Sequence, residues 1–536
     1  MQLSRRRFLA LSATVPLAAC ASDDDAGAPD PTTIEPSDPT ATEQTPATTE
    51  TTTTVPETAP TESSEPGVAL SADPFVYGVA SGDPDDTSVV LWTRLDGALL
   101  NAEVGEESIE VAWTFEDDVS GETLTGLTST DRSLGWTIHE VVEIPGPGAF
   151  RFVTGGHESS PGRTAPIDPG TPEFRLATAS CQNFQSGFYA AHGDIAAWSP
   201  DLVVFLGDFI YEGPADEISD GVVRVTDPGE PVDVDGYRAR YATYLSDPQL
   251  QRSRAACPWL VIWDDHEVDN DYAGTNSQDE DDPAEFAARR LQAYRAWWEN
   301  TPTRLPAPDL TDDPNEPYPI HRGLDVGSLL RISALDGRQY RDDQLSETIL
   351  ELGPPVDGWD DPDRTMLGEE QEAWLAERFA SSTATWNCMA QQTVFADIRV
   401  GESILNYDQW DGYAAARDRI LANAPTNFVT VTGDIHLAGV GQIRRSDGTA
   451  VGTEFVTTAI SSTANVPPEL APIVRSVSAI VDAELEFRGY TRHAVTHDGW
   501  TAEYRQVADI ADPDSEVRTW KRFRVLAGDP TVSELT

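Results

Sequence analysis

Four apolar segments of this sequence each end on side chains that can bind a metal ion. The segments read FRLATASC, LVVFLGD, WLVIWDDHE and FVTVTGDIH. The groups at or just beyond their ends are Cys181, Asp208, Tyr211, Asp264, Asp265, His266, Glu267, Asp434 and His436. Carboxylate and phenolate oxygens suit Fe(III) or Ca(II), and a thiolate adds a softer donor suited to iron or zinc. Together these groups predict a site for more than one metal ion.

The segments that carry these groups have the composition of strands buried on both faces. Helical patterns lie among them. Asp282 can cap a helix whose first position is Pro283, and apolar residues then recur at helical spacing as far as Trp298. Strands that alternate with helices predict a layered α/β domain over residues 171–530. In such domains the loops after the strands cluster at one edge, where ligands bind.

A different pattern precedes this domain, between residues 71 and 165. Short β-rich runs such as IEVAWTF, WTIHEVVEI and AFRFVTGG alternate with Gly, Asp and Pro turns. This spacing favours a small immunoglobulin-like β-sandwich. The region shows no catalytic constellation, so the chemistry is expected in the later domain.

The N-terminus has the features of an export signal. Residues 1–20 contain a basic start with Arg5-Arg6, an apolar stretch too short to span a bilayer, and Cys20 at its end. The arginine pair resembles a twin-arginine signal, and LAAC resembles a lipobox, which predicts a surface protein lipid-anchored at Cys20. A plain cleaved signal is the alternative. Residues 21–70 are rich in Thr, Pro and acidic residues and predict a disordered linker.

The charge of the chain excludes several classes of partner. It carries 36 basic and 91 acidic residues, a net charge of −55. Such a field repels nucleic acids and anionic lipids, so we expect no nucleic-acid binding and membrane contact only through the lipid anchor. An anionic substrate would be repelled as well unless bound cations invert the local potential.

The cysteines beyond Cys20 number three, so at least one is expected to stay unpaired. Cys257 and Cys388 lie within apolar runs and are predicted to be buried packing residues. A disulfide between one pair of the three is the alternative.

The ordered part of the chain resembles the PhoD-like alkaline phosphatase family of the calcineurin-like metallophosphoesterase superfamily. The motifs that carry the resemblance are YGVASGDP, ASCQ, GDFIYEG, WDDHEVDNDY, LDGRQYRDDQL, WNCMAQQ and TGDIH, in this order. The resemblance implies a four-layer αββα catalytic domain preceded by the small β domain. It also implies hydrolysis of phosphomonoesters and phosphodiesters at a site that holds Fe(III) with one or two Ca(II), or divalent metals in their place.

Carried over residue by residue, the resemblance assigns the ligands. It implies that Fe(III) is bound by Cys181, Asp208, Tyr211 and Asp434. Asp208 would bridge to calcium, and the calcium side or the phosphate contacts would be completed by His436, Asp265 and Asn270. How the residues of the DDHE loop divide between these roles is left open.

The mechanism expected from this site is attack on phosphorus by a metal-activated oxygen nucleophile. His266 is a candidate acid for the leaving alkoxide, and His436 a second catalytic candidate. Arg338 and Arg341 can reach phosphate oxygens with their planar guanidinium groups. The alternative for both arginines is a salt bridge to Asp342 or Asp343.

Two other functions remain open on the sequence alone. The same fold can serve a phosphodiesterase of phospholipase D type that acts on lipid or cell-wall phosphodiesters. A lipid-tethered acidic protein can also bind calcium without catalysis. Phosphate-ester substrates and a monomeric chain are expected in the preferred interpretation.

Overall fold

The computed structural model describes a defined part of the chain. It covers residues 68–214, 222–226, 229–278, 282–346 and 353–535. The predicted signal over residues 1–20 and nearly all of the predicted linker over 21–70 lie outside the described residues. Among the described residues, no helix combines the length and the hydropathy needed to cross a bilayer.

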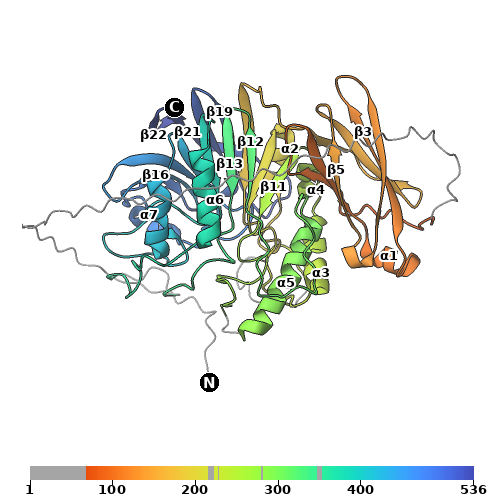
Figure 1. The fold of residues 1–536 in the computed structure, drawn as a ribbon, viewed down its shortest axis with the longest axis horizontal. Coiled ribbons are helices and arrows are strands. Elements are labelled where there is room, and N and C mark those ends of the chain that lie inside the picture. The colour runs from red at the N-terminus through yellow and green to blue at the C-terminus, as the bar shows by residue number, and fades with distance from the viewer. Residues whose placement is uncertain (1–67, 215–221, 227–228, 279–281, 347–352, 536) are drawn as a thin grey trace, which may run out of the picture. The chain divides into compact units, whose positions relative to one another are not determined.

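The largest element is a ten-stranded mixed sheet (Figure 1). Its strands, in spatial order, are β22 (Asp529–Leu535), β21 (Val517–Leu526), β20 (Gly499–Val507), β19 (Arg488–Thr496), β9 (Glu173–Ala179), β10 (Leu202–Leu206), β11 (Pro258–Ile262), β1 (Val79–Gly82), β2 (Ser88–Arg94) and β5 (Thr137–Glu143). The central strands β9, β10 and β11 run parallel. Every residue of β10 and β11 is buried, which is the pattern that their apolar runs predict.

A seven-stranded sheet packs against the first one. Its strands, in spatial order, are β12 (Arg322–Val326), β13 (Leu330–Ala334), β14 (Trp386–Ala390), β15 (Phe428–Thr432), β17 (Ala450–Val456), β16 (Ala438–Arg444) and β18 (Ile480–Glu484). The two sheets share one hydrophobic core. Within it the rings of Trp386 on β14 and Trp500 on β20 meet edge to face, with their centroids 5.8 Å apart. The sequence prediction of a layered α/β domain is therefore confirmed.

Helices cover these sheets, and two of them were predicted from the sequence. Helix α5 (Pro283–Asn300) begins as predicted, because the side chain of Asp282 accepts a hydrogen bond from the Ala284 amide at 3.0 Å. Its Tyr294 stacks on Trp263, just beyond β11, at 4.1 Å. Helix α6 (Gly368–Ala380) corresponds to the predicted segment GEEQEAWLAERFA and packs Phe379 against Phe428 of β15. Each helix thus covers one sheet.

The N-terminal strands belong to two sheets. A five-stranded sheet contains β4 (Thr123–Thr130), β3 (Ile109–Asp117), β6 (Gly148–Thr154), β7 (His157–Glu158) and β8 (Gly162–Thr164). Val89 of β2 and Ile138 of β5 pack with Phe115 and Phe150 of this sheet in one cluster. However, β1 also pairs with β11, so the large sheet runs on into this region. The alternating sequence pattern predicts the strands but cannot reveal this partner, because alternation specifies only which face each side chain occupies.

Candidate metal centre

Four strands deliver the predicted ligands to one place. β9, β10, β11 and β15 each end two residues before Cys181, Asp208, Asp264 and Asp434, respectively. The loop after β9 in one sheet and the loop after β15 in the other lie very close together. A β-carbon added at Gly433 would lie only 2.5 Å from the Ser180 hydroxyl, so only glycine fits there. The common edge that the sequence predicted is therefore present.

The side chains form three overlapping groups that can hold a cation. In each group the candidate ligand atoms lie within 4.8 Å of one another. The groups are Cys181–Asp208–His436, Asp208–Asp265–His266 and Asp264–Asp265–Asp434. Asp208 is shared by the first two groups, as expected of a bridging carboxylate. Beside Cys181 and Asp208 the geometry places His436, whereas the resemblance assigned Asp434 to that position.

Tyr211 completes the group around Cys181. Its hydroxyl donates to Asp208 Oδ2 at 2.8 Å and lies 3.0 Å from His436 Nε2. The Ser462 hydroxyl lies 2.8 Å from the same phenol oxygen. Burial raises the pKa of Tyr211 and of Cys181 well above their usual values, and the neighbouring Asp208 adds to both shifts. Both groups therefore need a cation in order to ionise at neutral pH.

The backbone is strained at the predicted ligands. Cys181, Asp208, Asp434 and His436 have φ angles of 56°, 58°, 63° and 55°, in the left-handed region. Non-glycine residues rarely adopt this conformation, and each costs about 1–3 kcal/mol unless the surroundings impose it. Gly207 allows the loop after β10 to lie close to the loop after β11, because a β-carbon at Gly207 would lie 2.5 Å from the β-carbon of Asp264. Four of the nine non-glycine residues with positive φ in the described part of the chain are therefore predicted ligands, and strained backbone of this kind is often found at functional sites.

The carboxylates are arranged to receive a cation. Among the described residues, Asp208 Oδ1 and Asp264 Oδ2 are buried without a hydrogen-bond partner. A buried carboxylate oxygen is costly unless it is paired or coordinates a metal. Burial raises the pKa of Asp208 and of Asp434 well above the usual range, and the nearby Asp264 contributes to both shifts. The residues present therefore fit a metal centre.

His436 is held in the form that binds metals. Its Nδ1 lies 2.6 Å from the carbonyl oxygen of Thr463, which can only accept, so Nδ1 carries the hydrogen. The lone pair of Nε2 is left to face Tyr211. Burial lowers the pKa of His436 to about 3, so the ring is neutral. A neutral imidazole oriented through its other nitrogen is the usual metal ligand.

His266 differs from His436 in its partners. Its Nδ1 lies 2.7 Å from Glu212 Oε2, and its ring packs on Tyr211 with centroids 4.0 Å apart. Burial opposes protonation, but Glu212 raises the pKa of His266 well above its usual value, with Asp265 and Asp208 adding to the effect. Its side chain keeps 20% exposure, so it borders the solvent-facing side of the site.

Asn270 lies beside this pair. Its backbone amide donates to Glu212 Oε1 at 3.0 Å, and its side-chain nitrogen donates to Gln278 at 2.8 Å. The amide oxygen is the atom of Asn270 that can bind a cation. Its predicted role as a calcium ligand stays a prediction.

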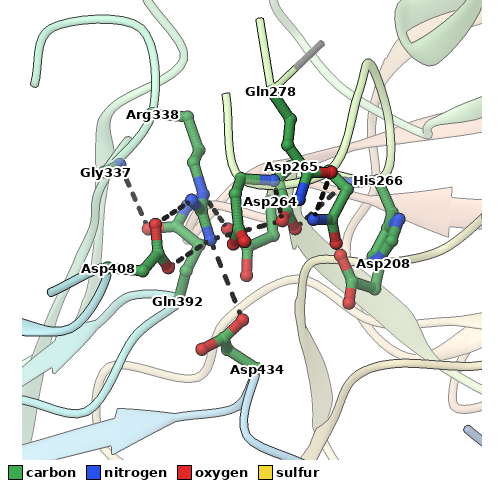
Figure 2. A network of polar contacts seen from close by, with 12 residues as sticks. Asp208, Asp264, Asp265, His266, Gln278, Gly337, Arg338, Gln392, Asp408 and Asp434 are labelled. Carbon is green, nitrogen blue, oxygen red and sulfur yellow. Dashed lines mark hydrogen bonds and ion pairs between the residues drawn. The ribbon is translucent and has the colours of Figure 1, made fainter. Parts of the chain in front are cut away.

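Arg338 and Arg341 are bound to carboxylates. Arg338 donates to both oxygens of Asp408, at 2.7 and 3.0 Å, and also to Asp264 (Figure 2). Arg341 donates to the same Asp408 at 2.6 Å. Both guanidinium groups are buried, and the nitrogens that bind Asp408 are not available to phosphate oxygens in this structure. Among the described residues, Nη2 of Arg341 is buried without a hydrogen-bond partner. Both arginines therefore form salt bridges, which was the predicted alternative to phosphate binding. The predicted partners, Asp342 and Asp343, were wrong, because the shared partner is Asp408.

Several site residues were missed by sequence reasoning. Glu212, Asp408, Ser462 and Arg488 contact the predicted ligands or their neighbours. Glu212 directly follows Tyr211, so the GDFIYEG motif contained a signal for it. The other three lie far along the chain from their partners, and no local spacing indicates them.

The described cysteines are all free and buried. They are Cys181, Cys257 and Cys388, and burial raises the pKa of each. The predicted burial of Cys257 and Cys388 is confirmed, and the alternative of a disulfide among these three is not.

Comparisons with known proteins cover most of the chain. Residues 176–504 match the family model described as PhoD-like phosphatase, and residues 60–167 match its N-terminal domain model. Alkaline phosphatase D of Bacillus subtilis (strain 168) is 36% identical over 480 residues, which cover 85% of this chain and 81% of the relative. A solved structure described as the structure of PhoD is 34% identical with a TM-score of 0.81, covering 87% of this chain and 93% of that one.

Proposed function

Because the chain belongs to the PhoD-like phosphatase family, we propose that it is a metal-dependent phosphatase acting on phosphomonoesters and phosphodiesters. The observation that carries this proposal is the convergence of a thiol, imidazoles and carboxylates in three groups whose ligand atoms lie within 4.8 Å of one another. Two of these groups share Asp208, and the phenol of Tyr211 lies 2.8 Å from the same Asp208. Buried carboxylate oxygens without partners at the same place support it.

We assign the groups to metals as follows. Cys181, Asp208 and Tyr211 would hold Fe(III), with His436 or Asp434 completing the set. Asp208, Asp265 and Asn270 would hold Ca(II) on the other side. When bound, these cations supply neutralisation of phosphate charge and lower the pKa of bound water. They would also counter the repulsion that a net charge of −55 exerts on an anionic substrate.

The protein residues around the metals have separate tasks. The hydrogen bond to Glu212 orients His266 so that it can donate a proton to the leaving oxygen. Asp408 holds Arg338 against Asp264, which keeps that carboxylate in place. Phosphoryl transfer depends mainly on such positioning and on electrostatic stabilisation.

The test of this proposal is a visible absorption spectrum of the natively produced protein before and after treatment with a strong chelator. Phenolate and thiolate bound to Fe(III) give a charge-transfer band. Loss of the band together with phosphatase activity would support iron at Tyr211 and Cys181. A colourless, active protein would remove the ferric assignment and indicate a divalent-metal enzyme.

The preference for phosphomonoesters or phosphodiesters can be measured with model substrates. Relative rates on an aryl phosphate and a bis-aryl phosphate separate a phosphatase from a phosphodiesterase of lipid or cell-wall esters. Absence of hydrolysis of both, with metals bound, would favour the non-catalytic calcium-binding alternative.

We also infer the arrangement and the location of the chain. Helix α5 on one sheet and α6 on the other, with a shared core between the sheets, support the four-layer αββα arrangement. Arg5-Arg6 and Cys20 support export by the twin-arginine route and lipid anchoring. Metabolic labelling with a fatty-acid analogue, compared with a Cys20→Ser variant, tests the anchor.

A further inference from the structure

Arg488 is a buried arginine that contacts a candidate metal ligand, His436. It is the first residue of β19 and is 4% exposed. Its Nη1 donates to the carbonyl oxygens of His436 at 2.6 Å and Phe487 at 2.8 Å, and its Nη2 donates to that of Leu485 at 3.3 Å. No salt bridge to Arg488 is found within the described part of the chain. Backbone carbonyl oxygens take the place of an ion pair for this buried guanidinium, and one of them belongs to a candidate metal ligand, His436.

The first contact of Arg488 fixes a ligand. The carbonyl oxygen of His436 accepts from Arg488 and also from the Thr458 hydroxyl at 3.3 Å. His436 is one of the residues with a left-handed backbone. Such a conformation persists only where the surroundings impose it, and a charged donor to the carbonyl is a strong constraint. With the backbone fixed in this way, the ring can keep its bond to Thr463.

The backbone next to Arg488 also reaches the pocket of two other candidate ligands. The amide of Gly489 donates to the carbonyl oxygen of Ala459 at 2.8 Å, and Ala459 forms a small buried cluster with Cys181 and Tyr211. An arginine side chain stays charged in proteins. A thiol and a phenol that bind a metal do so as anions, and a positive charge nearby favours those anions.

We propose that Arg488 is a positioning residue of the metal centre. Its guanidinium fixes the backbone of His436 and supplies the buried positive charge beside the thiol and phenol ligands. The inference rests on the proposed function, because it requires that Cys181, Tyr211 and His436 bind metal.

The experiment compares Arg488→Met with Arg254→Met in the full chain, purified with its native metals. Arg254 is a matched control, because it is 1% exposed, has no salt bridge among the described residues, and donates to the Asn300 carbonyl oxygen. The readouts are iron per protein, the position of the visible band, and the time needed for a chelator to remove iron.

We expect Arg488→Met to lose iron to the chelator about tenfold faster or more, the effect typical of groups that orient metal ligands. Its band should move to longer wavelength, since the electrons of the phenolate and thiolate are less stabilised. Arg254→Met should keep both properties. Wild-type retention and an unchanged band in Arg488→Met, or equal losses in both variants, would overturn the inference.

Two further variants keep the test decisive. Arg488→Lys is the substitute if Arg488→Met does not fold, because it retains the charge without the planar group. Its visible band should stay in place, while the chelator should remove iron faster than from the wild type. Unchanged iron retention in Arg488→Lys would contradict the positioning role. Thr458→Val removes the neutral hydroxyl that donates to the carbonyl oxygen of His436, and it should leave the visible band unchanged. A band shift in Thr458→Val as large as that in Arg488→Met would contradict the role of charge. A wild-type protein without metal would refute the proposed centre itself.

Discussion

Replacement of Glu212 by glutamine tests the role of His266 directly. The glutamine keeps the length of the side chain and an acceptor oxygen, but it removes the charge that faces His266 Nδ1 at 2.7 Å. Asp265 and Asp208 also raise the pKa of His266. Cations bound at those two carboxylates would cancel their contributions. Glu212 is then the group that continues to favour the protonated ring in the loaded enzyme.

The size of the effect follows from the hydrogen bond. A hydrogen bond to a charged group contributes about 1.5–3 kcal/mol. One pKa unit corresponds to about 1.4 kcal/mol, so Glu212→Gln should lower the pKa of His266 by about one to two units. Because the acid must be protonated, the alkaline limb of the rate profile moves to lower pH by the same amount. Above that limb, kcat/KM should fall about 10- to 100-fold.

The assay is kcat/KM against pH with an alkyl phosphate and an aryl phosphate. The alkyl ester has the poorer leaving group and needs the acid more, so its rate should fall further. Metal content measured on the same samples is the control. An unmoved alkaline limb with the alkyl ester, at unchanged metal content, would refute the assignment of His266 as the acid.

Three further predictions address the centre and the fold. Asp208→Ala should lose both metal and hydrolysis, since Asp208 is shared by two ligand groups, and metal analysis with an activity assay checks this; full activity would contradict the site assignment. Asp408→Asn should destabilise the protein by about 3 kcal/mol in denaturant unfolding, because it leaves two buried arginines without their shared carboxylate, and wild-type stability would be the contrary result. Burial lowers the pKa of His139 to about 3, so only the unfolded chain takes up this proton as pH falls below about 6.5, and stability is lost in that range. His139→Phe should therefore reduce the loss of unfolding free energy between pH 6.5 and 4 by about 1.4 kcal/mol per pH unit. An unchanged pH dependence of the unfolding free energy would contradict this prediction.

The sequence allowed the strands and most candidate ligands to be predicted. Cys181, Asp208 and Asp434 each follow a continuous apolar run. Cys181 and Asp208 follow neighbouring parallel strands of one sheet, which end at a common edge, whereas Asp434 follows a strand of the second sheet. The capping of α5 by Asp282 is likewise a local pattern. In each case the information lies within a few neighbouring residues.

The remainder depends on contacts between distant parts of the chain. Arg338 binds Asp408, which lies 70 positions later. Asp342, immediately beside Arg341, instead accepts a hydrogen bond from the Thr365 amide at 2.8 Å. Local charge therefore predicted Asp342 and Asp343 as partners and was misleading. The left-handed backbone at the ligands was also not predicted, because the loops of two sheets impose it on residues that do not favour it.

The position of β9 within the large sheet has a consequence for biosynthesis. Cys181 follows β9, which pairs with β10 on one side and with β19 on the other, and Thr178 of β9 contacts His493 of β19 from 315 positions away. Chains dominated by such long-range pairing fold slowly. β9 cannot complete its pairing before β19 has been synthesised, so metal binding at the proposed centre would follow synthesis of the chain at least as far as Thr496. An export route that carries folded proteins would let this happen inside the cell, before the enzyme meets the outside medium.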